Sequence, residues 1–225
     1  EPGFNKDHWS AYDIRSPKQH LSYGRSLAAN SLLFATPLAS AGGSALYVRL
    51  LSSQGRVSTD PAIIGGPSTL SALAVSQLQT RQIATASDDG VIRIYNLPES
   101  WTEGELPNPN TITPTLSFSL GRRVQILQYN QYIDNVLVAT GYDANTQKES
   151  LFIFDTSSTN DDEQRFREYP GLIAGRACSL EFSPDGTHLA IADKSNSIAI
   201  VALPSGELRT TFKHGPNPKE SWALW

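Results

Sequence analysis

The residues that could carry out chemistry are few in this sequence and lie far apart. No histidine is paired with another histidine, a cysteine or a carboxylate at the spacing that a metal site needs. The histidines are His8, His20, His188 and His214. The glycine-rich stretches at 42–44 and 65–68 lack the spacing of a phosphate-binding loop, and no G-x-S-x-G nucleophile motif is present. The sequence therefore predicts no metal site, no cofactor and no enzymatic activity.

Charged residues gather locally in the sequence. Acidic residues gather at 155–163, but no glycine takes the sixth place of a calcium loop, so we interpret this segment as a solvated loop. Basic residues lie together in three places: Arg122 with Arg123, Arg165 with Arg167, and Lys213 with Lys219. Two interpretations of these basic residues stay open: ordinary surface charge, or a cationic rim that steers a partner with an acidic surface.

The composition is that of a β-rich globular protein without a basic field. The chain has 225 residues, of which 39% are hydrophobic and 18% charged, and its net charge is −4. Aromatic residues do not interleave with the bases as a nucleic-acid surface would need, and no apolar run reaches the length of a membrane span. We therefore expect neither a nucleic-acid partner nor membrane insertion.

Cys178 is the single cysteine and lies in an apolar run, which indicates a small core residue in a reducing compartment. A cytoplasmic protein is therefore expected. The chain has no methionine and begins with Glu1, so we expect a processed chain or part of a longer one.

A pattern of paired strands returns at intervals of about fifty residues, which is close to the period of repeats that form propeller blades. Each copy has a strand of small residues, a polar turn and a second alternating strand. The copies lie at 39–51, 83–97, 136–156 and 189–203, and another alternating strand precedes the last three. A four-stranded sheet cannot bury both faces alone, so such sheets must stack around a centre. The sequence therefore predicts an all-β protein, a WD-repeat β-propeller; the alternative is a β-sandwich.

The expected domain organisation is an N-terminal extension at 1–19 followed by a propeller at 20–225. The predicted blades are 20–60, 62–106, 112–160, 164–210 and a partial fifth at 211–225. Within the second blade, 70–76, 82–87 and 91–96 should be adjacent antiparallel strands. Too few residues lie between Lys213 and Ser221 to complete a blade. We therefore expect either a chain break between His214 and Trp222 or a ring that stops after four blades.

Several short motifs resemble coronins, a family of WD-repeat propellers. The matching segments are Gly42-Gly43, Leu46 to Leu50, Gly55-Arg56-Val57, Ser87-Asp88-Asp89, Leu97-Pro98-Glu99 and Ala223-Leu224-Trp225. The resemblance runs from about Lys18 to the last residue, and its motifs are specific in combination rather than singly. It departs from the family at Gly65-Gly66-Pro67, where many WD blades carry a Gly-His dipeptide.

The resemblance implies a scaffold that binds filamentous actin and its nucleating complex, controls filament organisation or turnover, and is associated with the cytoskeleton. Coronins carry the motif K-F-R-H-[VI]-[FY]-G, in which the arginine is implied to grip the filament; here His20 takes the arginine position, while Lys18, Tyr23 and Gly24 match. The predicted partner-binding residues are Lys18, His20, Arg25, Arg122, Arg123, Arg165 and Arg167.

Other functions remain open at this stage. A general WD-repeat adaptor, in membrane traffic or in substrate recognition by a ubiquitin ligase, would use the same scaffold to bind peptide motifs. A hydrolytic or lyase-type propeller is disfavoured, since no acid–base or metal constellation is present. Oligomerisation is expected only through a segment that this sequence does not contain, such as a coiled coil.

Overall fold

The structure, a computed structural model, describes residues 9–10, 27–38, 44–52, 55–56, 63–64, 68–101, 112–157 and 166–213. Every regular element in these ranges is a β-strand. Sixteen of the strands form four antiparallel sheets of four strands each, and β1 (Trp9–Ser10) pairs in parallel with β5 (Gly55–Arg56).

Each sheet is built in chain order from neighbouring strands. The first sheet contains β2 (Ala28–Ala29), β3 (Leu33–Leu38), β4 (Ala45–Leu50) and β6 (Ile63–Ile64). The second contains β7 (Leu70–Val75), β8 (Gln82–Ser87), β9 (Val91–Asn96) and β10 (Leu116–Ser119). The third contains β11 (Arg123–Tyr129), β12 (Val136–Asp143), β13 (Lys148–Asp155) and β14 (Phe166–Ile173). The fourth contains β15 (Ala177–Phe182), β16 (His188–Asp193), β17 (Ser197–Ala202) and β18 (Glu207–Lys213).

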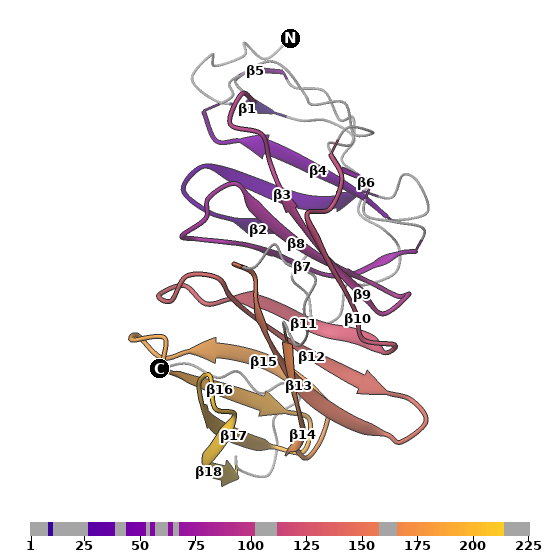
Figure 1. The fold of residues 1–225 in the computed structure, drawn as a ribbon, viewed down its shortest axis with the longest axis vertical. Helices are drawn as coiled ribbons and strands as arrows, with labels where there is room; N and C mark the ends of the chain where they lie inside the picture. The colour runs from indigo at the N-terminus through magenta and orange to yellow at the C-terminus, as the bar shows by residue number, and fades with distance from the viewer. Residues whose placement is uncertain are drawn as a thin grey trace.

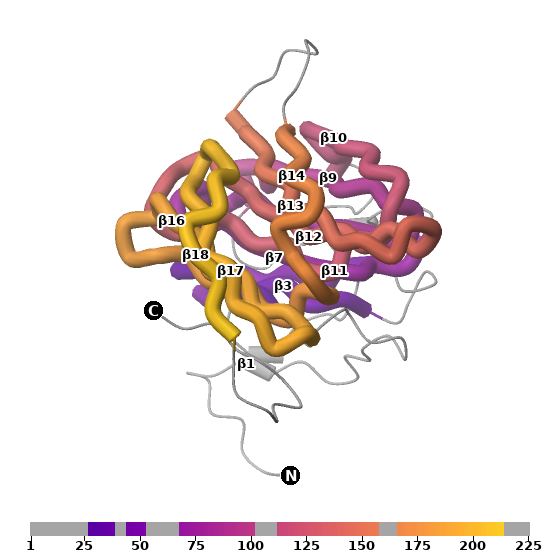
Figure 2. Tube along the Cα trace, turned by 90° about the horizontal axis from the view of Figure 1, so that it is seen from below, coloured from indigo at the N-terminus to yellow at the C-terminus, as the bar shows by residue number. Residues whose placement is uncertain are grey.

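The four sheets follow one another in chain order along the long axis of the molecule (Figure 1). Seen along this axis, strands of successive sheets lie over one another (Figure 2). The first strand of each sheet contacts the first strand of the next: β2 lies against β7, β7 against β11 and β11 against β15. We call β2, β7, β11 and β15 the inner strands. This arrangement is a series of propeller blades, and it excludes a two-sheet sandwich.

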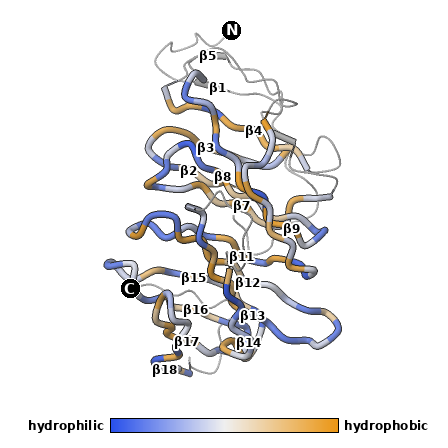
Figure 3. The backbone as a smooth tube through the Cα atoms, viewed as in Figure 1, coloured by the Kyte–Doolittle hydropathy of each residue, from blue (hydrophilic) through white to orange (hydrophobic). Residues whose placement is uncertain are grey.

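The core lies between successive sheets, because the strands alternate apolar side chains toward both neighbours. In β9, Ile92 and Ile94 belong to the cluster shared with the third sheet, whereas Tyr95 belongs to the cluster shared with the first. The third and fourth sheets share a further cluster around Leu151, Ile191 and other aliphatic residues. Figure 3 shows the resulting hydrophobic colour along the strands and hydrophilic colour at the turns.

The turn between β8 and β9 requires glycine for two reasons. Gly90 has a φ of 77°, in the left-handed region that other residues rarely adopt. A Cβ atom on Gly90 would also lie 2.9 Å from the backbone nitrogen of Arg122, which leads into the third sheet. The tight turn therefore lets two neighbouring blades approach each other closely.

The second sheet packs one of its faces against the third sheet. The corresponding face of the fourth sheet carries similar apolar residues. Ile92 in β9 pairs with Phe118 in β10, and Ile198 in β17 pairs with Phe212 in β18 in the same way. Phe118 is 5% exposed, but Phe212 is 54% exposed. Within the described ranges, the series of sheets therefore ends on a partly open apolar face, and closure of a ring is not shown.

The predicted strands at 70–76, 82–87 and 91–96 are confirmed as β7, β8 and β9, adjacent and antiparallel. The sheets differ from the predicted blade boundaries by one strand, because β10 pairs with β9 and β14 pairs with β13. Each repeat in the sequence begins with a strand that belongs to the preceding sheet as its last, outer strand. The pattern of hairpins does not show that this strand joins the preceding sheet rather than the following one. The predicted extension at 1–19, apart from β1, and the predicted break between His214 and Trp222 lie outside the described residues.

Candidate protein-binding surface

Arg122 and Arg123 lie where the chain passes from the second sheet into the third. The Arg122 guanidinium donates a hydrogen bond of 2.8 Å to Glu168 and one of 3.2 Å to the Ser150 hydroxyl, and its carbon lies 5.5 Å from the centre of the Phe152 ring. Such a contact combines an ion pair with stacking over an aromatic face. Arg122 is therefore engaged in holding the third sheet together.

Arg123 connects two sheets. Its Nε atom lies 2.9 Å from a carboxylate oxygen of Asp88, in the turn between β8 and β9. The Arg123 side chain is 51% exposed, so this pair is screened by water and weaker than a buried one. Arg123 thus remains reachable from solvent, although its charge is compensated by Asp88.

Arg167 differs from Arg122 and Arg123, because it forms no ion pair with a described residue. It is exposed near the start of β14, opposite Ile153 of β13. It lines a cavity of about 450 Å³ with Asp134, Asp155 and Pro204. The other predicted residues, Lys18, His20, Arg25 and Arg165, lie outside the described residues.

Asparagine side chains fasten neighbouring sheets at the turn that follows an inner strand, which the sequence reading missed. The Asn130 amide donates 2.9 Å to the Gly186 carbonyl of the fourth sheet, while its oxygen accepts from the backbone of Tyr132 and Ile133. Asn30 does the same for the first and second sheets, donating to the carbonyls of Ser76 and Thr80.

The four turns that follow the inner strands carry Asn30, Ser76, Asn130 and Ser183, a polar residue at one repeated place. Ser76 and Ser183 accept bonds within their own turns, from Gln79 and His188. A polar residue recurs at the end of each inner strand. This repeat is the sequence signal that could have predicted the hydrogen bonds between neighbouring sheets.

One serine, aspartate and histidine lie close together but do not form a catalytic triad. Ser183 donates a 2.6 Å hydrogen bond to Asp185 and accepts one from the backbone nitrogen of His188. The His188 ring instead bonds the hydroxyl of Thr187 through Nδ1, and the Ser183 hydroxyl contacts only the backbone of His188, so the histidine is not placed as a base for this serine. The group therefore stabilises a turn, and the part of the chain that the structure describes contains no cluster of potential metal ligands.

Glu149 is an ionisable group buried between the third and fourth sheets. It is 3% exposed, and neither carboxylate oxygen makes a hydrogen bond with a described residue. Burial raises its pKa to about 7, and the nearby Thr140 hydroxyl and Arg176 guanidinium oppose this rise only in part. Its protonation state therefore affects the stability of the fold, because a buried carboxylate is costly unless it is paired.

We expect Glu149 to make the fold less stable as pH rises. Its pKa of about 7 in the folded state lies above the ordinary glutamate value of 4.5, so the unfolded chain releases the proton first. The free energy of unfolding should therefore fall by about 2 kcal/mol between pH 5 and pH 8. Urea denaturation should show that Glu149→Gln removes most of this fall. An equally steep fall in the variant would exclude Glu149 as its source.

No family model matches the chain, but individual relatives and structures do. Human Coronin-7 is 25% identical over 191 residues, which is 85% of this chain and 19% of the relative. The WD40 domain of Toxoplasma gondii coronin superposes with a TM-score of 0.68 at 21% identity, covering 89% of this chain and 47% of that one. This is a coronin-like WD-repeat domain. Villidin of Dictyostelium discoideum is 30% identical over 147 residues, 64% of this chain and 8% of the relative.

The coronin-like domain thus spans about one fifth of the length of Coronin-7. The resemblance that the sequence motifs indicated is confirmed by these relatives, and so is the WD-type propeller fold. Among the described residues, no helix is long and apolar enough to cross a membrane.

Proposed function

We propose that this coronin-like domain is a non-enzymatic scaffold that binds actin filaments and influences their organisation or turnover. The observation that carries the proposal is the agreement of sequence and fold: Coronin-7 aligns over 85% of the chain, and a coronin propeller superposes over 89% of it. Propellers recognise partners through loops that a rigid framework displays, which fits the tightly fastened sheets seen here. A nucleating complex of actin is a further partner of the same proposal.

Cationic residues are the proposed filament contacts. An acidic filament surface attracts them over a distance and orients the encounter. Arg167 is exposed and free of ion pairs with described residues, and Arg165 lies two positions before it in the sequence. Arg122 is the least suited of the predicted residues, because Glu168 and Ser150 already occupy its guanidinium. Lys18 and Arg25 flank His20, which takes the place of the arginine in the coronin motif.

Binding should be weak, because a neutral histidine supplies less attraction than the arginine it replaces. We expect the purified chain to pellet with actin filaments at about 50 mM salt and to be largely released at about 200 mM, since exposed charges are screened. The measurement is co-sedimentation across this salt range. Binding that is equally tight at both salt concentrations would contradict cationic contacts, and no pelleting at low salt would contradict the proposed function.

A further inference from the structure

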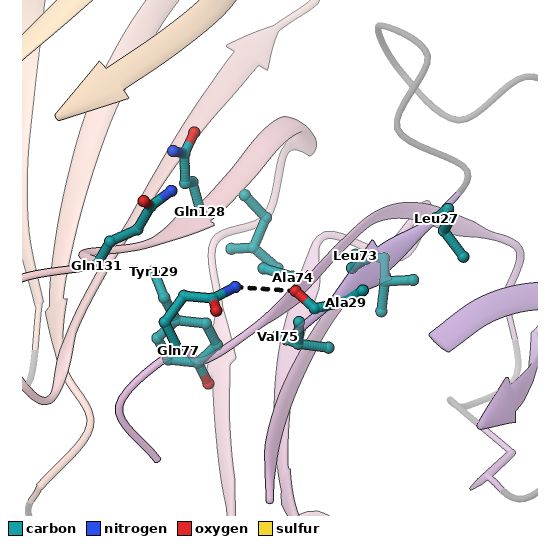
Figure 4. Close-up of a pocket in the computed structure, with 11 residues that line it drawn as sticks. Leu27, Ala29, Leu73, Ala74, Val75, Gln77, Gln128, Tyr129 and Gln131 are labelled. Carbon is teal, nitrogen blue, oxygen red and sulfur yellow. Dashed lines mark hydrogen bonds between the residues drawn. The ribbon is translucent and has the colours of Figure 1, made fainter. Parts of the chain in front are cut away.

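The inner side of the series of sheets is fastened from sheet to sheet. Figure 4 shows a pocket there, bounded by Leu27, by β7 and by β11, in which the Gln77 amide donates 2.8 Å to the Ala29 carbonyl. This bond joins the second sheet to the first, as the Asn130 amide joins the third to the fourth. The surface that lacks a neighbouring sheet among the described residues lies elsewhere, on the fourth sheet.

That surface is the face of the fourth sheet that points away from the third. Across it, Ala192 pairs with Ile198 and Ile198 with Phe212, while Ala190 pairs with Ile200. The alanines and isoleucines form one small apolar cluster, in which the isoleucines are only partly buried, and Phe212 is 54% exposed. We call these five residues the end face. Exposed apolar side chains that lie together mark a surface that another segment or molecule covers.

The second sheet has a corresponding face, and there the cover is in place. Each of the corresponding residues is at most 5% exposed: Ala84, Ala86, Ile92, Ile94 and Phe118. Strand β13 of the third sheet contributes Phe152 and Phe154 to this cover, two positions apart on one side of the strand. The ring centres of Phe118 and Phe154 lie 4.9 Å apart. A face of this kind is therefore covered by large apolar side chains at alternate positions of a strand.

A segment with this pattern follows the fourth sheet in the sequence. Residues 214–225 come directly after β18 and lie outside the described residues. They include Trp222 and Leu224, which are two positions apart and would lie on the same side of an extended strand. The segment therefore carries large apolar side chains at the same spacing as the two phenylalanines of β13.

The segment is also long enough to reach the end face. β18 ends at Lys213, next to Phe212, so the segment starts at one edge of this face. The connecting residues 214–221 span up to about 26 Å when extended, at roughly 3.3 Å per residue. The end face covers three neighbouring strands, which is two strand spacings or about 10 Å. Trp222 can therefore reach across it.

A second copy of the chain fits the end face less well. In a head-to-tail assembly, the opposing surface would be the face of the first sheet that points away from the second. This face carries Phe34, Leu38, Ala45 and Tyr47, and each of these side chains is at most 6% exposed. It is therefore not free to receive the end face of another copy.

We propose that residues 222–224 cap the end face of their own chain, with Trp222 and Leu224 packed on its isoleucines and on Phe212. The cap takes the place on the fourth sheet that the third sheet takes on the second. Repeat proteins need such caps, because an uncovered apolar face at the end of a series makes the protein poorly soluble. The cap does not involve the cationic residues proposed to meet actin filaments, so either proposal can fail without the other.

The test detects contacts in the whole chain, labelled with carbon-13 at the isoleucine δ1 methyl groups. Nuclear Overhauser contacts should join the indole protons of Trp222 to the methyl groups of Ile198 and Ile200. Trp222→Ala should abolish these contacts and shift both methyl resonances downfield, because the ring current of the indole is lost. The methyl groups of Ile92 and Ile94 should not shift, since the third sheet covers them. The contacts in the parent chain decide the question even if the variant fails to fold.

Trp225→Ala is the matched control variant. Trp225 lies three positions after Trp222 and would point to the other side of an extended strand, so the contacts of Trp222 should remain. Two results would overturn the proposal. If the methyl groups of Ile198 and Ile200 show no contact with Trp222, the segment does not cap the face. If the contacts weaken on dilution and sedimentation velocity shows a dimer, the end face belongs to an interface with a second copy.

Discussion

Replacing Asn130 with alanine is expected to cost about 2–4 kcal/mol of unfolding free energy, because three hydrogen bonds of a buried side chain are lost at once. The change leaves the Gly186 carbonyl without the asparagine donor and the backbone amides of Tyr132 and Ile133 without an acceptor. Asn130 is 2% exposed, so water cannot easily take over these bonds. Chemical denaturation of the purified variant measures the loss.

Asn130→Ser separates the two roles of this side chain. Serine occupies the matching place in the second and fourth sheets and accepts bonds within the turn there. We therefore expect the serine variant to keep part of the turn, to lose the bond to the fourth sheet, and to cost about half as much as alanine. Equal losses in both variants would mean that the link between sheets, not the turn, carries the whole effect; negligible losses would refute the fastener itself.

Gly206→Ala is expected to be the most disruptive single substitution in the fourth sheet. Gly206 has a φ of 71°, and a Cβ atom there would run into the ring of Tyr169 in the third sheet. The Tyr169 hydroxyl also donates 2.8 Å to the Pro204 carbonyl, which limits how far the ring can move. Left-handed strain costs about 1–2 kcal/mol, and the clash between sheets adds to it.

Gly171→Ala is the control for Gly206→Ala. Its φ of 78° imposes the same backbone strain, but a Cβ atom there meets nothing within 4 Å. Thermal unfolding should show a clearly larger loss for Gly206→Ala than for Gly171→Ala. Similar losses would attribute the effect to backbone strain alone and would argue against close packing of Tyr169 on this turn.

The strand hairpins were predictable because their pattern is local. In β8 and β9, alternating residues and the turn at Gly90 lie within a few positions of each other, and period-2 alternation needs no distant information. The residues at which each blade begins and ends were not predictable. β14 is largely exposed and contains Pro170, which an edge strand tolerates, so its sequence pattern does not show which sheet it joins.

The candidate site was only partly predictable, because contacts between distant residues decide which charges are free. Arg122 and Arg123 are adjacent basic residues in the sequence, and Glu168, the partner of Arg122, lies 46 residues away. The same holds for Asn130 and Gly186, which are 56 residues apart. The sequence gives no sign that the Gln128 amide is buried without a hydrogen-bond partner among the described residues, since its neighbours alternate like those of any strand.

Zero-length carbodiimide cross-linking of the chain to actin filaments, read by mass spectrometry, tests the central claim most directly. This chemistry joins a lysine amine to a carboxylate only where the two already form a contact. The account predicts cross-links from Lys18, two positions before His20, to carboxylates of actin. Lys148, exposed at the start of β13 and outside the predicted binding residues, should give none. Cross-links from Lys148 but not Lys18, or none at low salt, would contradict the account.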